Sequence, residues 1–200
     1  MEDIVDSEKV RAEIEGQSII EEYSKIVDAP LFHVSLSKFC IMFVMTFGLY
    51  QLYWAFKQWQ ALRNFYQLDA WPVARSFFSI FFTHSLFVYI TEYIKETERE
   101  YSWHQTGYAT LYVFLVVVGS LFSNLIDEDS TNILLWSLTF VIPMMVVLPL
   151  YKAQKAINFA LETVSYSSND KLTLFNWLWI ILGTAYWGLI VFSLVIIALG

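Results

Sequence analysis

Five long apolar runs divide this 200-residue chain and limit what it can fold into. They cover residues 39–56, 77–94, 108–126, 133–151 and 175–199, and no charged side chain lies at the centre of any of them. A helix rises about 1.5 Å per residue, so runs of about eighteen residues or more can cross the hydrocarbon core of a bilayer. The sequence therefore predicts an all-α fold, a polytopic membrane helical bundle with about five transmembrane helices.

The composition agrees with the membrane class. Hydrophobic residues make up 57% of the chain and charged residues 16%, against about 45–50% and about 25% in soluble domains. The aromatic share is 18%, and Trp and Tyr collect at bilayer interfaces because their rings are amphipathic. The chain has no dense basic patch, so nucleic acid is not expected as a partner. Its single cysteine, Cys40, excludes an internal disulfide.

An acidic N-terminal tail, residues 1–37, is predicted to precede a transmembrane domain over 38–200. The first 38 residues hold nine acids and four bases, without a basic start and an apolar core, so no signal peptide is expected. Ser18 fits a helix cap. One helical face then carries Ile19, Ile20, Tyr23, Ile26 and Val27. We interpret this short amphipathic helix as a tail packed on its own protein or as a docking segment for a protein partner through residues 1–30.

Two amphipathic stretches, at about 55–67 and 152–164, are predicted to lie in the membrane interface. In the first, Lys57 and Gln60 lie on the helical face opposite Trp59 and Leu62. This pattern suits a helix with its rings in lipid and its amines at the phosphates. The residues predicted to contact the interface and the lipid headgroups are Tyr50, Tyr53, Trp54, Lys57, Trp59, Arg63, Arg75, Lys152 and Lys155.

A second candidate site is a polar stripe inside the second apolar run. Ser79 and Thr83 lie at helical spacing with His84 beside them, and Asn124 lies near the end of the third run. Polar side chains in an apolar helix usually face other helices, and an intramembrane histidine can carry protons. One histidine makes no metal site, so a packed, hydrogen-bonded His84 is the preferred interpretation. No metal and no cofactor are expected.

Two parts of the chain repeat a pattern of Tyr, then Lys four residues later, after an apolar run. Tyr53 and Lys57 follow the first run, and Tyr151 and Lys155 follow the fourth. With five crossings the two parts would run in opposite directions, as inverted repeats do in many transporters. Chance and common interface chemistry explain so short a match at least as well.

The positions of Lys and Arg near the run ends set the orientation in the membrane. With five crossings and the N-terminus in the cytoplasm, nine bases face the cytoplasm and three, Lys57, Arg63 and Arg75, face outward. This count favours a cytoplasmic N-terminus in the cell inner membrane. The three outward bases fit poorly, and a shallow hairpin of the first two runs, which does not fully cross, would place them differently.

The stretch around these bases resembles a family of uncharacterised small bacterial multi-pass membrane proteins with a domain of unknown function. The matching residues are Lys38, Thr46 to Trp54, Lys57, Trp59, Leu62, Arg63, Pro72, Arg75 and Phe78. Residues 155–158 and Trp187 are similar to the second half of the family, and Phe56 stands where the family has a tyrosine. The resemblance implies a bacterial inner-membrane protein and carries over no catalytic residue.

Three classes of function can be compared at this point. The favoured one is a non-enzymatic scaffold or accessory membrane subunit, because proton and ion pathways usually need buried charges. The alternative is a small transporter or channel acting as a homo-oligomer, favoured by Pro143 and by the polar stripe. An enzyme is not expected, because no Ser/His motif, HExxH sequence or phosphate loop is present. Membrane lipids are expected to surround the protein, whether it is a scaffold or a transporter.

Overall fold

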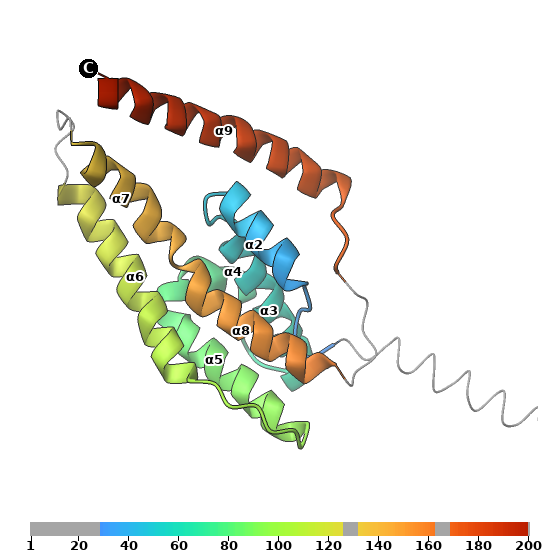
Figure 1. Ribbon diagram of the computed structural model, residues 1–200. Helices are drawn as coiled ribbons and strands as arrows, with labels where there is room; N and C mark the ends of the chain where they lie inside the picture. The colour runs from blue at the N-terminus through green and yellow to red at the C-terminus, as the bar shows by residue number, and fades with distance from the viewer. Residues whose placement is uncertain (1–28, 126–131, 163–168, 200) are drawn as a thin grey trace, which may run out of the picture.

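Helices and the turns between them make up the part of the chain that a computed structural model describes, residues 29–125, 132–162 and 169–199 (Figure 1). The predicted all-α class is confirmed for this part, and the predicted amphipathic helix of the tail lies outside it. The helices are α2 (Leu36–Met45), α3 (Tyr50–Tyr66), α4 (Pro72–Phe77), α5 (Ser79–Glu96), α6 (Gln105–Leu125), α7 (Ile133–Met144), α8 (Val147–Leu161) and α9 (Leu174–Leu199).

Three helical segments are long and apolar enough to cross a membrane, as expected of a membrane protein. They are Gln105–Asn124, Ile133–Leu161 and Leu174–Leu199. In the most apolar 18-residue stretch of each segment, only 22%, 17% and 11% of the residues, respectively, are buried inside the protein. Such wide apolar faces are typical of helices that contact lipid or another protein. The predicted count of five crossings is not confirmed.

The first apolar run, 39–56, is divided between α2 and α3, so the prediction of one continuous helix there is wrong. Phe47 and Gly48 have φ angles of 53° and 83°, and glycine reaches this left-handed region without steric cost. The Thr46 hydroxyl donates to Met42 O at 2.7 Å and accepts from Tyr50 N at 2.9 Å. Thr46 therefore joins the end of α2 to the start of α3 through one side chain.

The other apolar runs agree more closely with the helices. The second run corresponds to α5, which follows the short helix α4, and Pro72 takes the first helical position of α4, where no amide is needed. The kink expected at Pro143 is present as a break between α7 and α8. The predicted amphipathic helix at 55–67 forms the larger part of α3. The described part of the one predicted at 152–164 belongs to α8, which begins earlier, at Val147.

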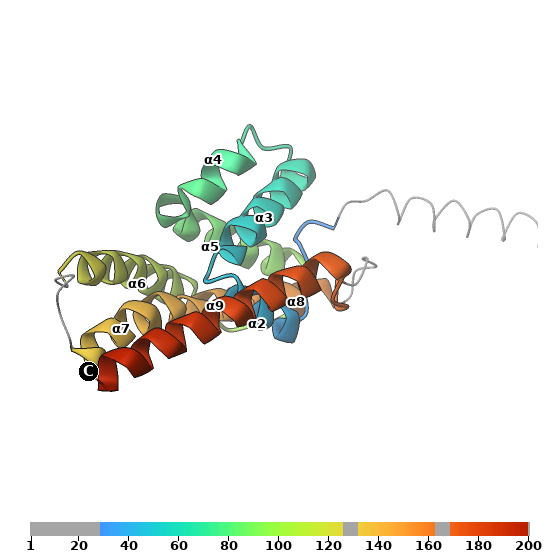
Figure 2. The ribbon, with the colours of Figure 1, turned by 90° about the horizontal axis from the view of Figure 1, so that it is seen from above.

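A compact body contains α2 to α5, α8 and the first half of α6, and an apolar arm extends from it (Figures 1 and 2). The arm contains the second half of α6, α7 and the end of α9. The largest fully buried side chains of the body include Trp54, Trp59, Phe39, Phe43 and Phe87. Burial of several rings of this size is the main favourable contribution to folding of the body.

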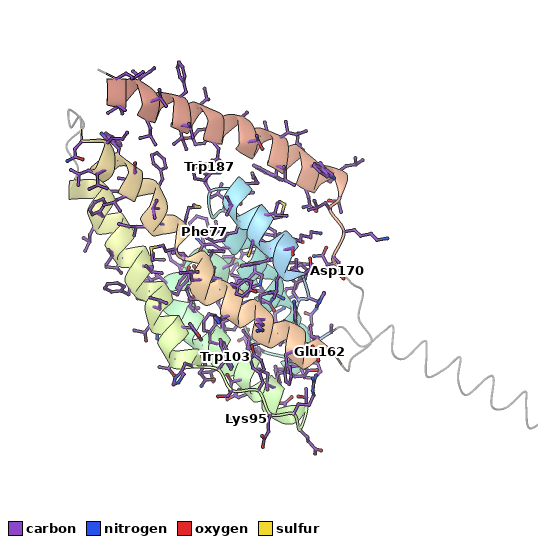
Figure 3. All side chains as sticks on the ribbon, in the orientation of Figure 1. Phe77, Lys95, Trp103, Glu162, Asp170 and Trp187 are labelled. Carbon is purple, nitrogen blue, oxygen red and sulfur yellow. The ribbon has the colours of Figure 1, made fainter. Side chains whose placement is uncertain are left out.

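The charged side chains gather at the end of the molecule opposite the arm, where Figure 3 shows Lys95, Glu162 and Asp170. Arg99 Nη2 lies 2.7 Å from Glu162 Oε2 and joins the segment after α5 to the end of α8. The Tyr66 hydroxyl donates to Glu96 Oε1 at 2.9 Å and joins the ends of α3 and α5. We call the region around residues 96–99, 162 and 169–171 the charged end.

Candidate functional site

A cavity of about 380 Å³ lies between α2, the start of α3 and the start of α9, and we call it the Lys38 pocket. It begins at the charged end and follows α2 toward the turn at residues 46–49. Its lining residues are Lys38, Met42, Thr46, Leu49, Tyr50, Tyr53, Asn169, Thr173, Phe175, Asn176 and Trp179. A concave, largely apolar site with a few polar groups is the usual form of a small-molecule pocket.

Lys38 is the charged group of this pocket, and its side chain is only 5% exposed. Its ammonium donates to Asn169 Oδ1 at 2.7 Å and to the carbonyl of Lys171 at 2.8 Å. Burial lowers the pKa of Lys38, and the nearby negative charge of Asp170 partly opposes that shift. Ser35 begins α2 and accepts the Lys38 amide at 3.4 Å, which fixes where the lysine enters the pocket.

The far end of α2 is fixed by contacts with α9. Trp187 Nε1 donates to the Val44 carbonyl at 3.1 Å, and this oxygen also accepts the amide of Phe47 at 3.2 Å in the turn after α2. The Trp187 ring stacks on Phe47 with centroids 4.9 Å apart. Gly183 lies directly against the Met45 carbonyl, where a Cβ atom would overlap the oxygen. These contacts fix the position of α9 beside α2, and so the position of the pocket wall that α9 forms.

Buried amides hold the chain that leads into α2. Gln58 Oε1 accepts Phe32 N at 3.0 Å, and Gln58 Nε2 donates to Phe32 O at 2.9 Å. Asn158 Nδ2 donates to Val34 O at 2.9 Å, and Gln154 Nε2 donates to Asn158 Oδ1 at 2.6 Å. Because α3 and α8 both contribute to this cluster, it fixes the position of α2 and of the pocket relative to them.

The predicted interface aromatics have different positions from those expected. Tyr50, Trp54 and Trp59 are buried at 7%, 1% and 1% exposure, so the prediction that their rings lie at the lipid interface is wrong. Trp54 Nε1 donates to Gln154 Oε1 at 2.5 Å inside the body. Tyr53 is exposed and lies at the rim of the Lys38 pocket. The sequence pattern is the same for a ring in lipid and a ring in a protein core, because both need an apolar face.

The predicted headgroup-contacting bases divide into two sets. Arg63, Lys152 and Lys155 are exposed. Arg75 lies over the Trp59 ring, 4.4 Å from its centroid, so it covers the core of the body. Lys57 lies 5.7 Å from the centroid of the Phe32 ring.

The predicted intramembrane polar residues do not form one site in the structure. The Ser79 hydroxyl and the Tyr112 hydroxyl are 2.7 Å apart, and the buried Thr83 donates to Ser79 O at 2.6 Å. His84 is exposed, and its Nε2 lies 3.2 Å from Thr110 Oγ1. Asn124 donates to the carbonyl of Ser120, four residues back, in the arm. Ser79 and Thr83 are therefore brought together, whereas His84 and Asn124 lie apart from them.

The lining of the pocket provides hydrogen-bond donors and apolar walls for binding. No group of three or more His, Cys, Asp or Glu side chains able to hold a metal ion occurs among the described residues. The pocket has one ammonium, two amides, two threonine hydroxyls and two tyrosines beside apolar walls. Such a lining can bind an amphipathic molecule and orient its polar end.

The sequence indicated Lys38 only through the family resemblance and the orientation count, and it did not indicate the pocket. A lysine at the start of an apolar run is usually interpreted as reaching toward the headgroups. Lys38 and Asn169 are 131 positions apart in the chain. No local spacing pattern joins residues so distant, so the sequence had no signal for this contact.

Comparison with known proteins adds no relative. No protein family matches the chain, and no curated protein and no solved structure matches it at a significant level. The resemblance to the family of small bacterial membrane proteins stays a prediction.

Proposed function

We propose that this chain is an integral protein of the bacterial inner membrane that acts without catalysis, as a scaffold or accessory subunit. The main support for this proposal is the hydrogen bonding of the polar side chains of α6, α7 and α9. These helices contain no charged residue. Six polar side chains on them donate to carbonyls three or four residues back in the same helix: Ser123, Asn124, Ser137, Thr139, Thr184 and Ser193. Thr110 and Tyr112 of α6 and Trp187 of α9 instead contact α5 and α2 of the body.

This arrangement favours a scaffold over the alternative, a small transporter acting as an oligomer. A pathway for protons or ions usually needs polar or ionisable groups turned toward a shared, wet cavity. Groups that bond to their own helix leave an apolar outer surface instead. The exposed apolar faces of α9, such as those of Leu189 and Phe192 at 63% each, are then free for lipid and for a partner subunit or second copy.

Three crossings also give a simpler orientation than five. The nine described Lys and Arg residues all lie outside α6, α7 and α9, while residues 126–131, between α6 and α7, include three acids and no base in the sequence. A cytoplasmic charged end therefore agrees with the positive-inside rule at the ends of the three crossings. Lys57 and Arg75 lie within α3 and α4, over the rings of Phe32 and Trp59. In this proposal α2 with α3 and α4 with α5 are two hairpins that enter the membrane from the cytoplasm and return. The shallow alternative raised by the sequence was a single hairpin of the first run with the second.

The depth of the first hairpin follows from its contact with α9. Met45, at the end of α2, touches Gly183, which lies nine residues after Leu174, the first residue of α9. At 1.5 Å per residue this is about 14 Å, or roughly half of a hydrocarbon core of about 30 Å. The hairpin would thus end near the middle of the membrane.

Photo-crosslinking in native membranes tests the scaffold proposal. Benzoylphenylalanine at Phe192, on the exposed face of α9, is expected to give a discrete adduct with another polypeptide. The same probe at Arg63, which is exposed near the end of α3 and away from the apolar faces, is the control and should give no such adduct. Adducts with lipid alone from Phe192, or a proton or ion flux in proteoliposomes above that of empty liposomes, would contradict the proposal.

A further inference from the structure

We propose that the Lys38 pocket binds a monoanionic amphiphile, a long-chain fatty acid or an anionic phospholipid, with its oxyanion at Lys38 and its chain between α2 and α9. This goes beyond the proposed function, because a scaffold requires no ligand. The inference rests on three features of the pocket: its polar end is rich in donors, its charge suits one negative group, and its other end is apolar and open.

Donors outnumber acceptors at the polar end of the pocket. Asn169 Oδ1 already accepts from Lys38, and Asn176 Oδ1 accepts both the amide and the hydroxyl of Thr173 at 2.9 and 3.0 Å. With their oxygens engaged, both pocket-lining amides offer N–H groups. The ammonium adds a third donor group, since it carries three N–H groups and has two acceptors among the described residues. Donors of this kind are suited to a carboxylate or a phosphodiester.

The charge around Lys38 is suited to a ligand with a single negative charge. Asp170 lies near enough to Lys38 to stabilise the ammonium, yet it is not part of the pocket lining. One negative ligand group at Lys38 would be attracted by the ammonium inside a region of low dielectric. Asp170 would repel any anion, and a dianion about twice as strongly as a monoanion, which makes a free phosphate a poorer fit.

The other end of the pocket is suited to an acyl chain. From Lys38 to Thr46 the pocket follows eight residues of α2, which is about 12 Å of helix. Its wall there includes Met42, Leu49 and Trp179. Leu49 and Trp179 are 60% and 47% exposed, so this end opens at the protein surface along the apolar face of α9. A chain longer than the pocket could therefore continue into the bilayer.

A purely structural role for Lys38 has to be separated from ligand binding. Lys38 holds residues 169–171 against α2, so Lys38→Met would loosen the segment before α9 even without a ligand. Leu49→Asp avoids this problem because Leu49 is exposed and lies at the N-terminus of α3, where the helix dipole favours a negative charge. It places a negative charge at the apolar end, which should exclude an anionic amphiphile. Leu174→Asp is the matched control, at the exposed start of α9 and outside the pocket lining.

Photoaffinity labelling of the full chain in phosphatidylcholine nanodiscs tests the inference. The probes are a diazirine fatty acid, a diazirine phosphatidylglycerol and an uncharged diazirine diacylglycerol, with adducts mapped by peptide mass spectrometry. We expect saturable labelling of pocket residues by the fatty acid, the phospholipid or both, and little by the diacylglycerol. Lys38→Met should weaken the apparent affinity by about tenfold, the effect of losing one charge-assisted contact, and Leu49→Asp should weaken it by about as much through charge repulsion at the apolar end. Leu174→Asp should bind as the wild type does.

The outcomes separate clearly. Labelling by only one charged probe identifies the source of the oxyanion and supports the proposal. Equal labelling by the diacylglycerol, no labelling of pocket residues, or wild-type labelling of a folded Leu49→Asp protein would overturn it. If Lys38→Met does not fold, Leu49→Asp still decides the question. A failed scaffold crosslink at Phe192 would leave this result unaffected, because Phe192 is not part of the pocket lining.

Discussion

Gln58 shows how one buried amide can determine the course of a chain. Its side chain is fully buried and forms two hydrogen bonds with the backbone of Phe32, one through its oxygen and one through its nitrogen. The segment before α2 has no regular secondary structure at Phe32, so its backbone groups need partners from elsewhere. Gln58 supplies both partners at once.

Replacing this amide should therefore cost more than one hydrogen bond. We predict that Gln58→Leu lowers the free energy of unfolding by about 1–3 kcal/mol, because Phe32 N would lose its acceptor and Phe32 O would keep only the longer contact with Gln154 Nε2 at 3.5 Å. Gln60→Leu, two residues further along α3, is the control, since Gln60 bonds only to Lys57 at 3.3 Å among the described contacts. Thermal unfolding in detergent and hydrogen exchange at the Phe32 amide measure the difference. Equal loss in both variants would show that the amide pair is unimportant.

At the scale of elements, the attachment of α9 to α2 depends on a glycine. Gly183 lies against the Met45 carbonyl, whereas a Cβ atom at Gly188 would have no neighbour within 4 Å. We predict that Gly183→Ala destabilises the docked helix by about 1–3 kcal/mol through overpacking. Gly188→Ala should be neutral or stabilising by up to about 1 kcal/mol, because alanine is the better helix former.

Hydrogen exchange in α2, together with thermal unfolding in nanodiscs, distinguishes these two variants. Faster exchange in α2 is expected for Gly183→Ala alone, since Trp187 would no longer cover the Val44 carbonyl. Unchanged exchange and unfolding in Gly183→Ala would mean that α9 does not pack on α2 in the membrane.

The sequence predicted the helical class and the positions of most apolar helices, because runs of apolar residues report directly on burial in lipid or protein. It did not predict the division of the first run. Thr46, Phe47 and Gly48 are ordinary residues in a membrane helix. The turn is held by local hydrogen bonds, such as that from Gly48 N to Phe43 O at 2.8 Å, and by the packing of Phe47 on Trp187. Local pattern cannot supply such contacts, since Phe47 and Trp187 are far apart in the chain.

The site was harder to predict for a related reason. Trp54 and Trp59 have the spacing of an interface anchor, yet they lie in the core, where Arg75 covers Trp59. Periodicity shows that a face is apolar and does not show what covers it. The Lys38 pocket needs the loop at residues 169–173 and the start of α9 beside α2, and this is a property of the fold alone.

At the scale of the whole molecule, the positions of the helix ends give a testable topology. Tyr66 bonds to Glu96 and Arg99 to Glu162, so the ends of α3, α5 and α8 lie together at the charged end. Asn64 is exposed near this end of α3. Glu128 lies outside the described residues, in the sequence between α6 and α7. A three-crossing protein with a cytoplasmic charged end must therefore have Asn64 and Glu128 on opposite sides of the membrane.

Cysteine labelling in intact spheroplasts checks this arrangement. In a Cys40→Ser background, Glu128→Cys should react with a membrane-impermeant maleimide, whereas Asn64→Cys should react only after permeabilisation. Lys171→Cys, in the exposed segment before α9, is the control for the cytoplasmic side and should behave as Asn64→Cys does. Labelling of both Asn64→Cys and Glu128→Cys from outside would instead support five crossings. The two hairpins would then have to open, and Tyr66 and Glu96 would separate across the membrane, which would contradict the packing of α3 on α5.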